Sequence, residues 1–338
     1  MDTTLDLPAS PRQVVRARIA ISVVFFMLGT GTGLWAVHIP LVTERLKVDP
    51  AILGLALFSM AIGAVISMPL TGWAVARFGS RLPTQVTVLY YIVTIALPIL
   101  SPSVPFLFVT AFLFGAGLGS TDVAMNTQAT ELEKARGRPT MSSFHGFFSV
   151  GGLAGASLGA GIIAVGWGDG SGALVLAVIF FIVAVVAIRD LMRGEPVAGA
   201  GPRFGLPNRA VVGLGLIAFL AFAIEGSVTD WSALFLTNVR QASVTTAASG
   251  YALFSLAMAV CRLAGDPIVA RLGDRKIVIG GGLVMAAGIA VALVAPWPLV
   301  AAVGFALVGV GAANVVPVAF SGGGTTPGVH LSVGVASV

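Results

Sequence analysis

The sequence contains little charge and almost no cysteine. Of its 338 residues, 10% are charged and one is cysteine, while 57% are hydrophobic and 43 are glycine. An ordinary globular protein has about 25% charged residues, and a disordered chain has low hydrophobicity. The composition therefore excludes both a soluble protein and a disordered one, and predicts an all-α protein embedded in lipid.

The scarcity of cysteine and histidine excludes several kinds of site. Cys261 lies alone in an apolar run, and His38, His145 and His330 are far apart in the sequence. No intramolecular disulfide or cluster of metal ligands is therefore expected. A membrane enzyme would need such a cluster, or a nucleophile with its base. We expect no metal, no cofactor and no enzymatic activity. The net charge of +5 comes from residues between apolar runs, so no nucleic-acid partner is expected either.

Ten apolar stretches are long enough to cross a bilayer as helices. They predict a cytoplasmic tail over 1–17, a six-helix bundle over 18–188, a cytoplasmic linker over 189–209, an incomplete four-helix bundle over 210–320 and an irregular tail over 321–338. The stretches cover residues 18–41, 52–76, 82–100, 104–128, 141–165, 172–188, 210–236, 247–270, 277–294 and 297–320.

The positions of lysine and arginine predict the orientation in the membrane. Most of them lie in the N-terminal tail and in the loops after the second, fourth, sixth and eighth stretches, and only Arg45, Lys47 and Arg240 fall on the other side. Cytoplasmic loops carry the excess of Lys and Arg. We therefore expect a multi-pass protein of the plasma or inner membrane, with its N-terminus in the cytoplasm.

The chain also repeats itself. Residues 54–61 match residues 250–257 at six of eight positions, and residues 75–81 match residues 269–275. Residues 117–123 resemble residues 309–315, which pairs Asp122 with Asn314, and Trp35 pairs with Trp231. An offset of six spans predicts two halves with the same orientation in the membrane. The second half is expected to be two spans short, so a truncated relic that does not transport is the alternative to a working protein.

Two glycine- and arginine-rich loops carry a family resemblance. Gly72-Trp-Ala-Val-Ala-Arg-Phe-Gly-Ser-Arg81, with a degenerate copy ending Arg271-Leu-Gly-Asp-Arg275, resembles the loop motif of the major facilitator superfamily over ten of that family's twelve spans. Residues 122–128 and 137–146 further resemble a poorly characterised branch near the sugar and fucose permeases. Ala76 stands where the family motif has an acidic residue. The resemblance implies a two-bundle fold and a gating role for Gly72, Arg77, Gly79, Arg81, Arg271, Gly273 and Arg275.

Two acidic residues within apolar stretches are candidate proton or solute sites. Glu225 lies near the middle of its stretch, and Thr229 and Ser232 follow at helical spacing. Asp122 shares a predicted helix face with Asn126. An ionised carboxylate in lipid needs a partner or a proton, although a structural role for Asp122 is equally compatible with the sequence.

Other polar and small residues have simpler interpretations. Trp35 and Trp231 are candidate stacking platforms for a solute, but interfacial anchors are the more common use of tryptophan. Asn314 could bind solute or join helices. Arg262 and Asp266, four apart, are expected to pair on one helix face. Glycines at residues 151, 155 and 159 predict close helix packing.

Together with the resemblance, these residues predict a secondary transporter. We expect a monomer in the lipid bilayer that carries a small solute, such as a sugar or related polar metabolite, by alternating access between two bundles. A proton on Glu225 or Asp122 would drive it.

Overall fold

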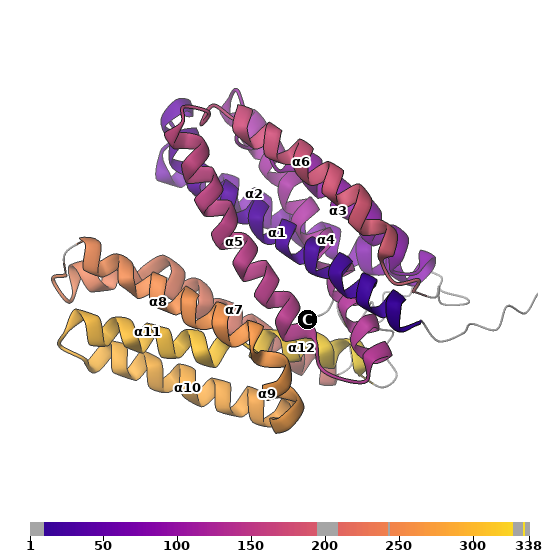
Figure 1. Cartoon of the computed structure of the whole chain (residues 1–338). Coiled ribbons are helices and arrows are strands. Elements are labelled where there is room, and N and C mark those ends of the chain that lie inside the picture. Colours follow the sequence, from indigo (N-terminus) through magenta and orange to yellow (C-terminus); the bar gives the residue numbers. More distant parts are fainter. Residues whose placement is uncertain (1–9, 195–208, 243, 327–333, 335–338) are drawn as a thin grey trace, which may run out of the picture. The chain divides into compact units, whose positions relative to one another are not determined.

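The protein is helical throughout the part that the structure describes. This computed structural model describes residues 10–194, 209–242, 244–326 and 334 (Figure 1). Parts of the expected tails over 1–17 and 321–338, and most of the expected linker over 189–209, lie outside the described residues. No strand occurs among the described residues, in keeping with the expected all-α class.

The described chain forms two compact units. The first consists of Met1–Arg138 and Gly151–Phe204, and the second of Pro139–Val150 and Gly205–Val338. The helix α5 (Met141–Ala164) is shared, because its first ten residues group with the second unit. The other helices of the first unit are α1 (Pro11–Leu46), α2 (Pro50–Phe78), α3 (Arg81–Thr94), α4 (Val104–Arg136) and α6 (Ser171–Ala187), followed by the 3-10 turn η1 (Ile188–Asp190).

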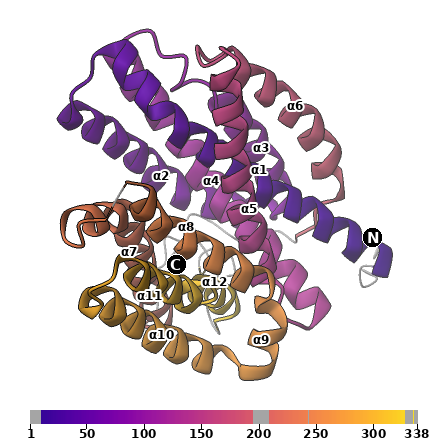
Figure 2. The same cartoon turned by 60° about the vertical axis from the view of Figure 1, so that its left-hand side comes forward.

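The second unit contains shorter and more interrupted helices. Within it, α10 and α11 run side by side in both views (Figures 1 and 2), and α11 also packs on α8. Its helices are α7 (Arg209–Asn238), α8 (Val244–Leu263), α9 (Gly265–Leu272), α10 (Asp274–Val294), α11 (Pro298–Ala312) and α12 (Val315–Thr325).

Each of the ten predicted stretches corresponds to a helix or a pair of helices, but the count of ten spans is not confirmed. Among the described residues, eight helices are long and apolar enough to cross a membrane, or nine if the bent pair α8 and α9 forms one span. The predicted stretch 82–100 is a helix only as far as Thr94, which makes α3 just 14 residues long.

Proline explains where three predicted stretches break. Proline lacks the N–H that would bind the carbonyl four residues earlier, and its ring clashes with that carbonyl. Pro98 lies four residues after Thr94, the last residue of α3, and Pro267 lies four residues after Leu263, the last residue of α8. Pro317, in the first turn of α12, lies four residues after Ala313, which is in the break between α11 and α12. At the break after Leu263 the chain bends by 64°.

The repeat seen in the sequence is present in the backbone, with a constant offset. Lys47 and Gln241 have left-handed conformations with φ of 53° and 52°, and Gly79 and Gly273 have φ of 75° and 77°. Both pairs are 194 residues apart. A Cβ atom at Gly115 would lie 1.9 Å from the carbonyl oxygen of Met60, and the equivalent atom at Gly309 would lie 2.3 Å from that of Phe254.

This constant offset changes two of the pairings inferred from sequence. The match of residues 75–81 with 269–275 has the structural offset of 194, whereas the other two matched segments have offsets of 196 and 192 and are each two residues out of register with the structure. Two residues turn a helical side chain by about 200°. Asn314 is therefore the counterpart of Ser120 and not of Asp122. Trp35 is buried and Trp231 is 65% exposed, so these two are not equivalent.

Two arginines that fall outside the predicted cytoplasmic clusters donate to backbone carbonyls at corresponding positions of the two units. Arg45 donates to the carbonyl oxygens of Ile99, at 2.5 Å, and Ser101, at 3.1 Å. In the second unit Arg240 donates to the carbonyl oxygen of Leu293, the residue 194 positions after Ile99. Leu293 lies in the last turn of α10, where carbonyl groups lack intrahelical partners, and arginine can supply one. Ile99 lies in the turn that follows α3, and Ser101 comes directly after that turn.

The glycines of α5 pack closely, as their spacing predicts. Cβ atoms at Gly151 and Gly155 would lie 2.1 Å and 2.0 Å from the carbonyl oxygens of Phe26 and Thr30 on α1. A Cβ at Gly161, on the same helix, would meet nothing within 4 Å. Gly151 and Gly155 therefore allow backbone contact with α1, and Gly159 also lies close to α1, since a Cβ there would be 2.5 Å from Val37 Cγ2. Gly161, outside the predicted set, has no such packing role.

We expect opposite effects from the same substitution at two of these glycines. Gly155→Ala should destabilise the protein by about 1–3 kcal/mol through overpacking, whereas Gly161→Ala should stabilise it by up to about 1 kcal/mol, the helix-propensity difference. Melting temperatures of the two purified variants in detergent measure this contrast. Equal shifts of the same sign would contradict the packing of α5 on α1.

Candidate functional site

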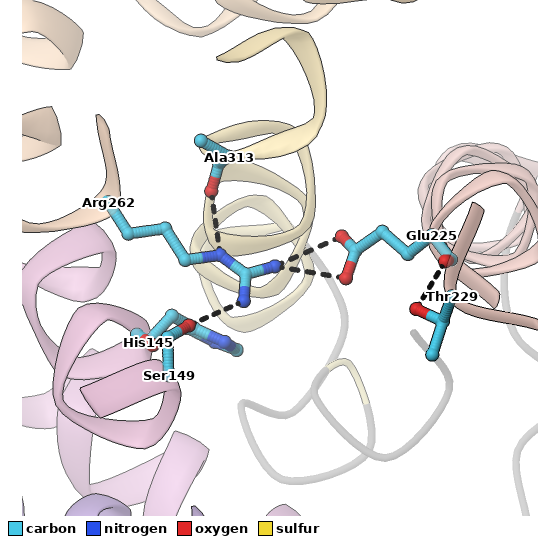
Figure 3. A network of polar contacts seen from close by, with 6 residues as sticks. All are labelled: His145, Ser149, Glu225, Thr229, Arg262 and Ala313. Atoms are coloured by element: carbon cyan, nitrogen blue, oxygen red, sulfur yellow. Dashed lines mark hydrogen bonds and ion pairs between the residues drawn. The ribbon is translucent and has the colours of Figure 1, made fainter. Parts of the chain in front are cut away.

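A buried ion pair joins α7 and α8 in the second unit. The Arg262 guanidinium donates through Nη2 to both carboxylate oxygens of Glu225, at 3.0 Å and 3.2 Å (Figure 3). The two side chains are 6% and 16% exposed. Glu225, predicted as the deepest acid of the chain, therefore has the charged partner that a carboxylate in lipid requires.

Two further contacts hold the guanidinium of Arg262. Its Nη1 donates to Ser149 Oγ at 3.0 Å, and its Nε donates to the carbonyl oxygen of Ala313 at 3.2 Å (Figure 3). Ser149 belongs to the part of α5 that groups with the second unit. Arg262 thus links α5, α7, α8 and the end of α11 at one point.

Pro317 makes the Ala313 carbonyl available. In an uninterrupted helix that carbonyl would accept from the N–H of residue 317, but proline has none. Arg262 Nε donates to this free carbonyl oxygen in place of the missing N–H. Pro317 therefore explains both the break between α11 and α12 and the position of the Arg262 guanidinium beside it.

Asn314 lies in the same break and joins it to α8. Its Nδ2 donates to the carbonyl oxygen of Cys261 at 3.3 Å, while its Oδ1 is buried without a hydrogen-bond partner. A Cβ at Gly265 would lie 2.0 Å from that Oδ1. Neighbouring residues at the end of α8 are thus bonded to neighbouring residues in the break after α11: Cys261 to Asn314, and Arg262 to Ala313. This arrangement places the Asn314 amide next to Arg262.

The expected pairing of Arg262 with Asp266 is wrong. Arg262 pairs with Glu225, and Asp266 Oδ1 accepts from the backbone N–H of Ser143 at 3.0 Å. The physical reason is the break at Ala264, because residues four apart share a face only when the helix is continuous. Pro267 in the sequence was the available signal for that break.

The polar residues after Glu225 on α7 do not share one environment. The Thr229 hydroxyl donates to the backbone carbonyl of Glu225 at 2.8 Å and is exposed. Ser232 is buried and its Oγ has no hydrogen-bond partner. Of these three side chains, only that of Glu225 is hydrogen-bonded to a side chain on another helix, so the three do not form one polar stripe.

Asp122 in the first unit is bonded within its own helix. The Nδ2 of Asn126 donates to the backbone carbonyl of Asp122 at 2.9 Å and to its Oδ1 at 3.2 Å. Asn126 is fully buried, whereas Asp122 is partly exposed. The predicted pair thus shares one helix face, and Asp122 has no ion-pair partner among the described residues.

The two candidate tryptophans differ in surroundings. Trp35 is 4% exposed, its ring centroid lies 6.5 Å from that of Phe114, and its Nε1 has no hydrogen-bond partner. Trp231 is exposed on α7, as suits an anchor in lipid or at the interface.

The predicted gating loops occupy equivalent positions in the two units. In the first, Gly72 and Arg77 lie in α2, Gly79 ends it, and Arg81 begins α3 and donates to the backbone carbonyl of Arg189. In the second, Arg271 lies in the last turn of α9, Gly273 ends that helix and Arg275 lies in the first turn of α10. The positive φ angles of both glycines favour glycine over other residues.

A polar cluster beside the first loop was not predicted. Ser80 donates to Glu131 Oε2 at 2.5 Å, and Gln128 Nε2 donates to Ser80 Oγ at 2.5 Å. Gln128 also exchanges two hydrogen bonds with the backbone of Met192. The cluster ties the chain after η1 to α4. The polar residues in the second half of α4 could have indicated this cluster, but a search for long apolar stretches does not consider them.

Comparisons with known proteins show the family. The family model "Major Facilitator Superfamily" matches residues 20–329, and the chain belongs to this family. An uncharacterized MFS-type transporter of Yersinia pestis is 37% identical over 324 residues, which cover 96% of this chain and 84% of the relative. The chain is therefore a multi-pass membrane transporter of a small solute and not an enzyme.

Solved structures share the fold. The E. coli fucose:proton symporter FucP matches with a TM-score of 0.71 and 15% identity, over 96% of this chain and 88% of that one. The human organic anion transporter MFSD10 matches with a TM-score of 0.73 and 18% identity, over 97% and 90%. These likenesses show the fold, which this chain shares with a fucose:proton symporter and with an organic anion transporter.

We expect the ion pair to be revealed by a double substitution that recovers stability. Arg262→Met should cost about 3–5 kcal/mol, because it leaves Glu225 buried without its partner. Adding Glu225→Leu should restore much of that loss, since both charges are then removed. Melting temperatures in detergent test this. Arg271→Met, at an exposed position, is the control and should change little. A double variant less stable than Arg262→Met would contradict the proposed energetics.

Proposed function

We propose that this protein carries a small polar solute, a sugar or related metabolite, across the plasma or inner membrane by alternating access, and that protons drive the transport. The proposal rests chiefly on the buried pair of Glu225 and Arg262. Support also comes from the fold shared with FucP, which is a fucose:proton symporter. In this proposal the chain works as a monomer with its N-terminus in the cytoplasm.

Glu225 is the proposed proton site because its pairing can be broken by one proton. A carboxylate loses most of its attraction to a guanidinium when it is protonated. Arg262 would keep its bonds to Ser149 and Ala313, so only the Glu225 arm would be released. Since Glu225 and Arg262 lie on different helices, a proton can change how α7 and α8 are held together.

Two other titratable groups bear on this assignment. His145 lies beside Arg262 and Ser149 (Figure 3), with its ring centroid 5.6 Å from that of Phe320. Asp122 in the first unit is a second candidate, held only by Asn126. Asn126, Asn314, Trp35 and Trp231 are proposed to contact solute or line its path, and the loops around Gly79 and Gly273 to gate it.

Proton movement in membrane vesicles tests the function. We expect an inward solute gradient, with L-fucose as the first probe and a panel of sugars and polar metabolites after it, to acidify everted vesicles that contain the protein. Glu225→Gln should abolish the pH change while leaving solute binding measurable. His145→Gln and Asp122→Asn are the matched controls at the other two titratable groups. Proton movement that persists in Glu225→Gln and stops in either control would move the proton site there.

A further inference from the structure

We propose that Arg262 binds the carboxylate of the transported solute when Glu225 takes up its proton, and that this solute is a small hydroxycarboxylate. This inference rests on the proposed function and names its solute class. Two contacts, from Ser149 Oγ and the Ala313 carbonyl oxygen, hold the guanidinium independently of Glu225. When Glu225 leaves, the donor that it used remains in position. A carboxylate is the natural replacement because guanidinium geometry suits it.

Charge balance favours an anion over a neutral sugar. With Glu225 ionised, the pair has no net charge. If Glu225 is protonated and a neutral solute binds, the buried site is left with one positive charge, which is costly inside a membrane protein. If the solute is a monoanion, its charge replaces that of Glu225 and the site stays neutral. One proton on Glu225 and one carboxylate on Arg262 therefore compensate each other.

Asn314 indicates the second group on the solute. Its Nδ2 donates to the Cys261 carbonyl, which fixes the orientation of the amide and leaves Oδ1 as a buried acceptor without a partner. Buried polar atoms normally have one. An acceptor beside Arg262 requires a donor, and a hydroxyl group close to the carboxylate supplies it. The absence of a side chain at Gly265 is what lets the Asn314 amide lie here, since a Cβ would be 2.0 Å from Oδ1.

Ligand-dependent melting of the purified full chain tests the binding step. The probes are glycolate, acetate and acetamide, with ionic strength held constant by sodium chloride. Glu225→Gln leaves the guanidinium without its internal anion, so glycolate should raise the melting temperature at concentrations about tenfold or more below those needed by the unaltered chain, a factor that corresponds to about 1.4 kcal/mol. Acetate should act more weakly, and acetamide should have no effect.

Two variants in the Glu225→Gln background serve as controls. Glu225→Gln with Arg262→Gln removes both charges, and it should lose the response to glycolate and acetate. Glu225→Gln with Asn314→Leu should keep the response to acetate and lose the extra response to glycolate. An equal response with and without Arg262, or an equal response to all anions including chloride, would overturn the proposal.

Charge movement in proteoliposomes separates this inference from the proposed function. Proton-coupled uptake of a monoanion carries no net charge, so a valinomycin-imposed potassium potential should leave glycolate uptake unchanged. Proton-coupled uptake of L-fucose that accelerates with an inside-negative potential would overturn the hydroxycarboxylate inference and keep the proposed function. Solute uptake without any proton movement would overturn the proposed function, while the melting experiment would still decide whether Arg262 binds carboxylates.

Discussion

The scarcity of charge makes the pair of Glu225 and Arg262 the central constraint on the second unit. A buried carboxylate and a buried guanidinium each lose several kcal/mol of hydration, which only a close and well-bonded partner offsets. Arg262 meets this requirement with contacts on α5, α7 and the end of α11, so the four helix segments that it joins have few alternative arrangements. The same contacts leave the guanidinium in position if Glu225 becomes neutral, which is the property that a proton-coupled site needs.

Proline determines where the donors and acceptors of this site become available. Within a continuous helix every carbonyl is used by the N–H four residues later, and a membrane offers no water as a substitute. Pro317 releases the Ala313 carbonyl and Pro267 the Leu263 carbonyl, and the two breaks meet where Arg262 and Asn314 lie. Yet α1 and α2 continue through Pro40 and Pro69. Proline alone is therefore not sufficient to break a helix in this chain.

The sequence was sufficient to predict the class and most helices, because long apolar runs have few structural alternatives in lipid. It could not fix the register of the internal repeat. Apolar segments use few residue types, so Gly54–Ala61 aligns well with Gly250–Ala257 at a shift of two residues from the structural offset. Sequence spacing also predicted that Arg262 pairs with Asp266, the acid four residues away. In the structure the bend after Leu263 separates these two, and α7 brings Glu225 to Arg262 instead. Side-chain pairing across helices depends on tertiary packing, which single-sequence periodicity does not contain.

The two units use the same backbone frame for different polar chemistry. Lys47 and Gln241 correspond at an offset of 194, as do Gly79 and Gly273. Arg45 and Arg240 are 195 residues apart, and both donate to carbonyl oxygens at corresponding positions, Ile99 and Leu293. The two candidate acids have no acidic counterparts at the offset of 194, because Asp122 corresponds to Val316 and Glu225 corresponds to Gly31. Asp122 is bonded to Asn126 on its own helix, so protonation of Asp122 would change few contacts between α4 and other helices. Glu225 is held by a different helix, so its protonation alters how α7 and α8 are joined. This difference favours the second unit as the place where proton binding is converted into movement.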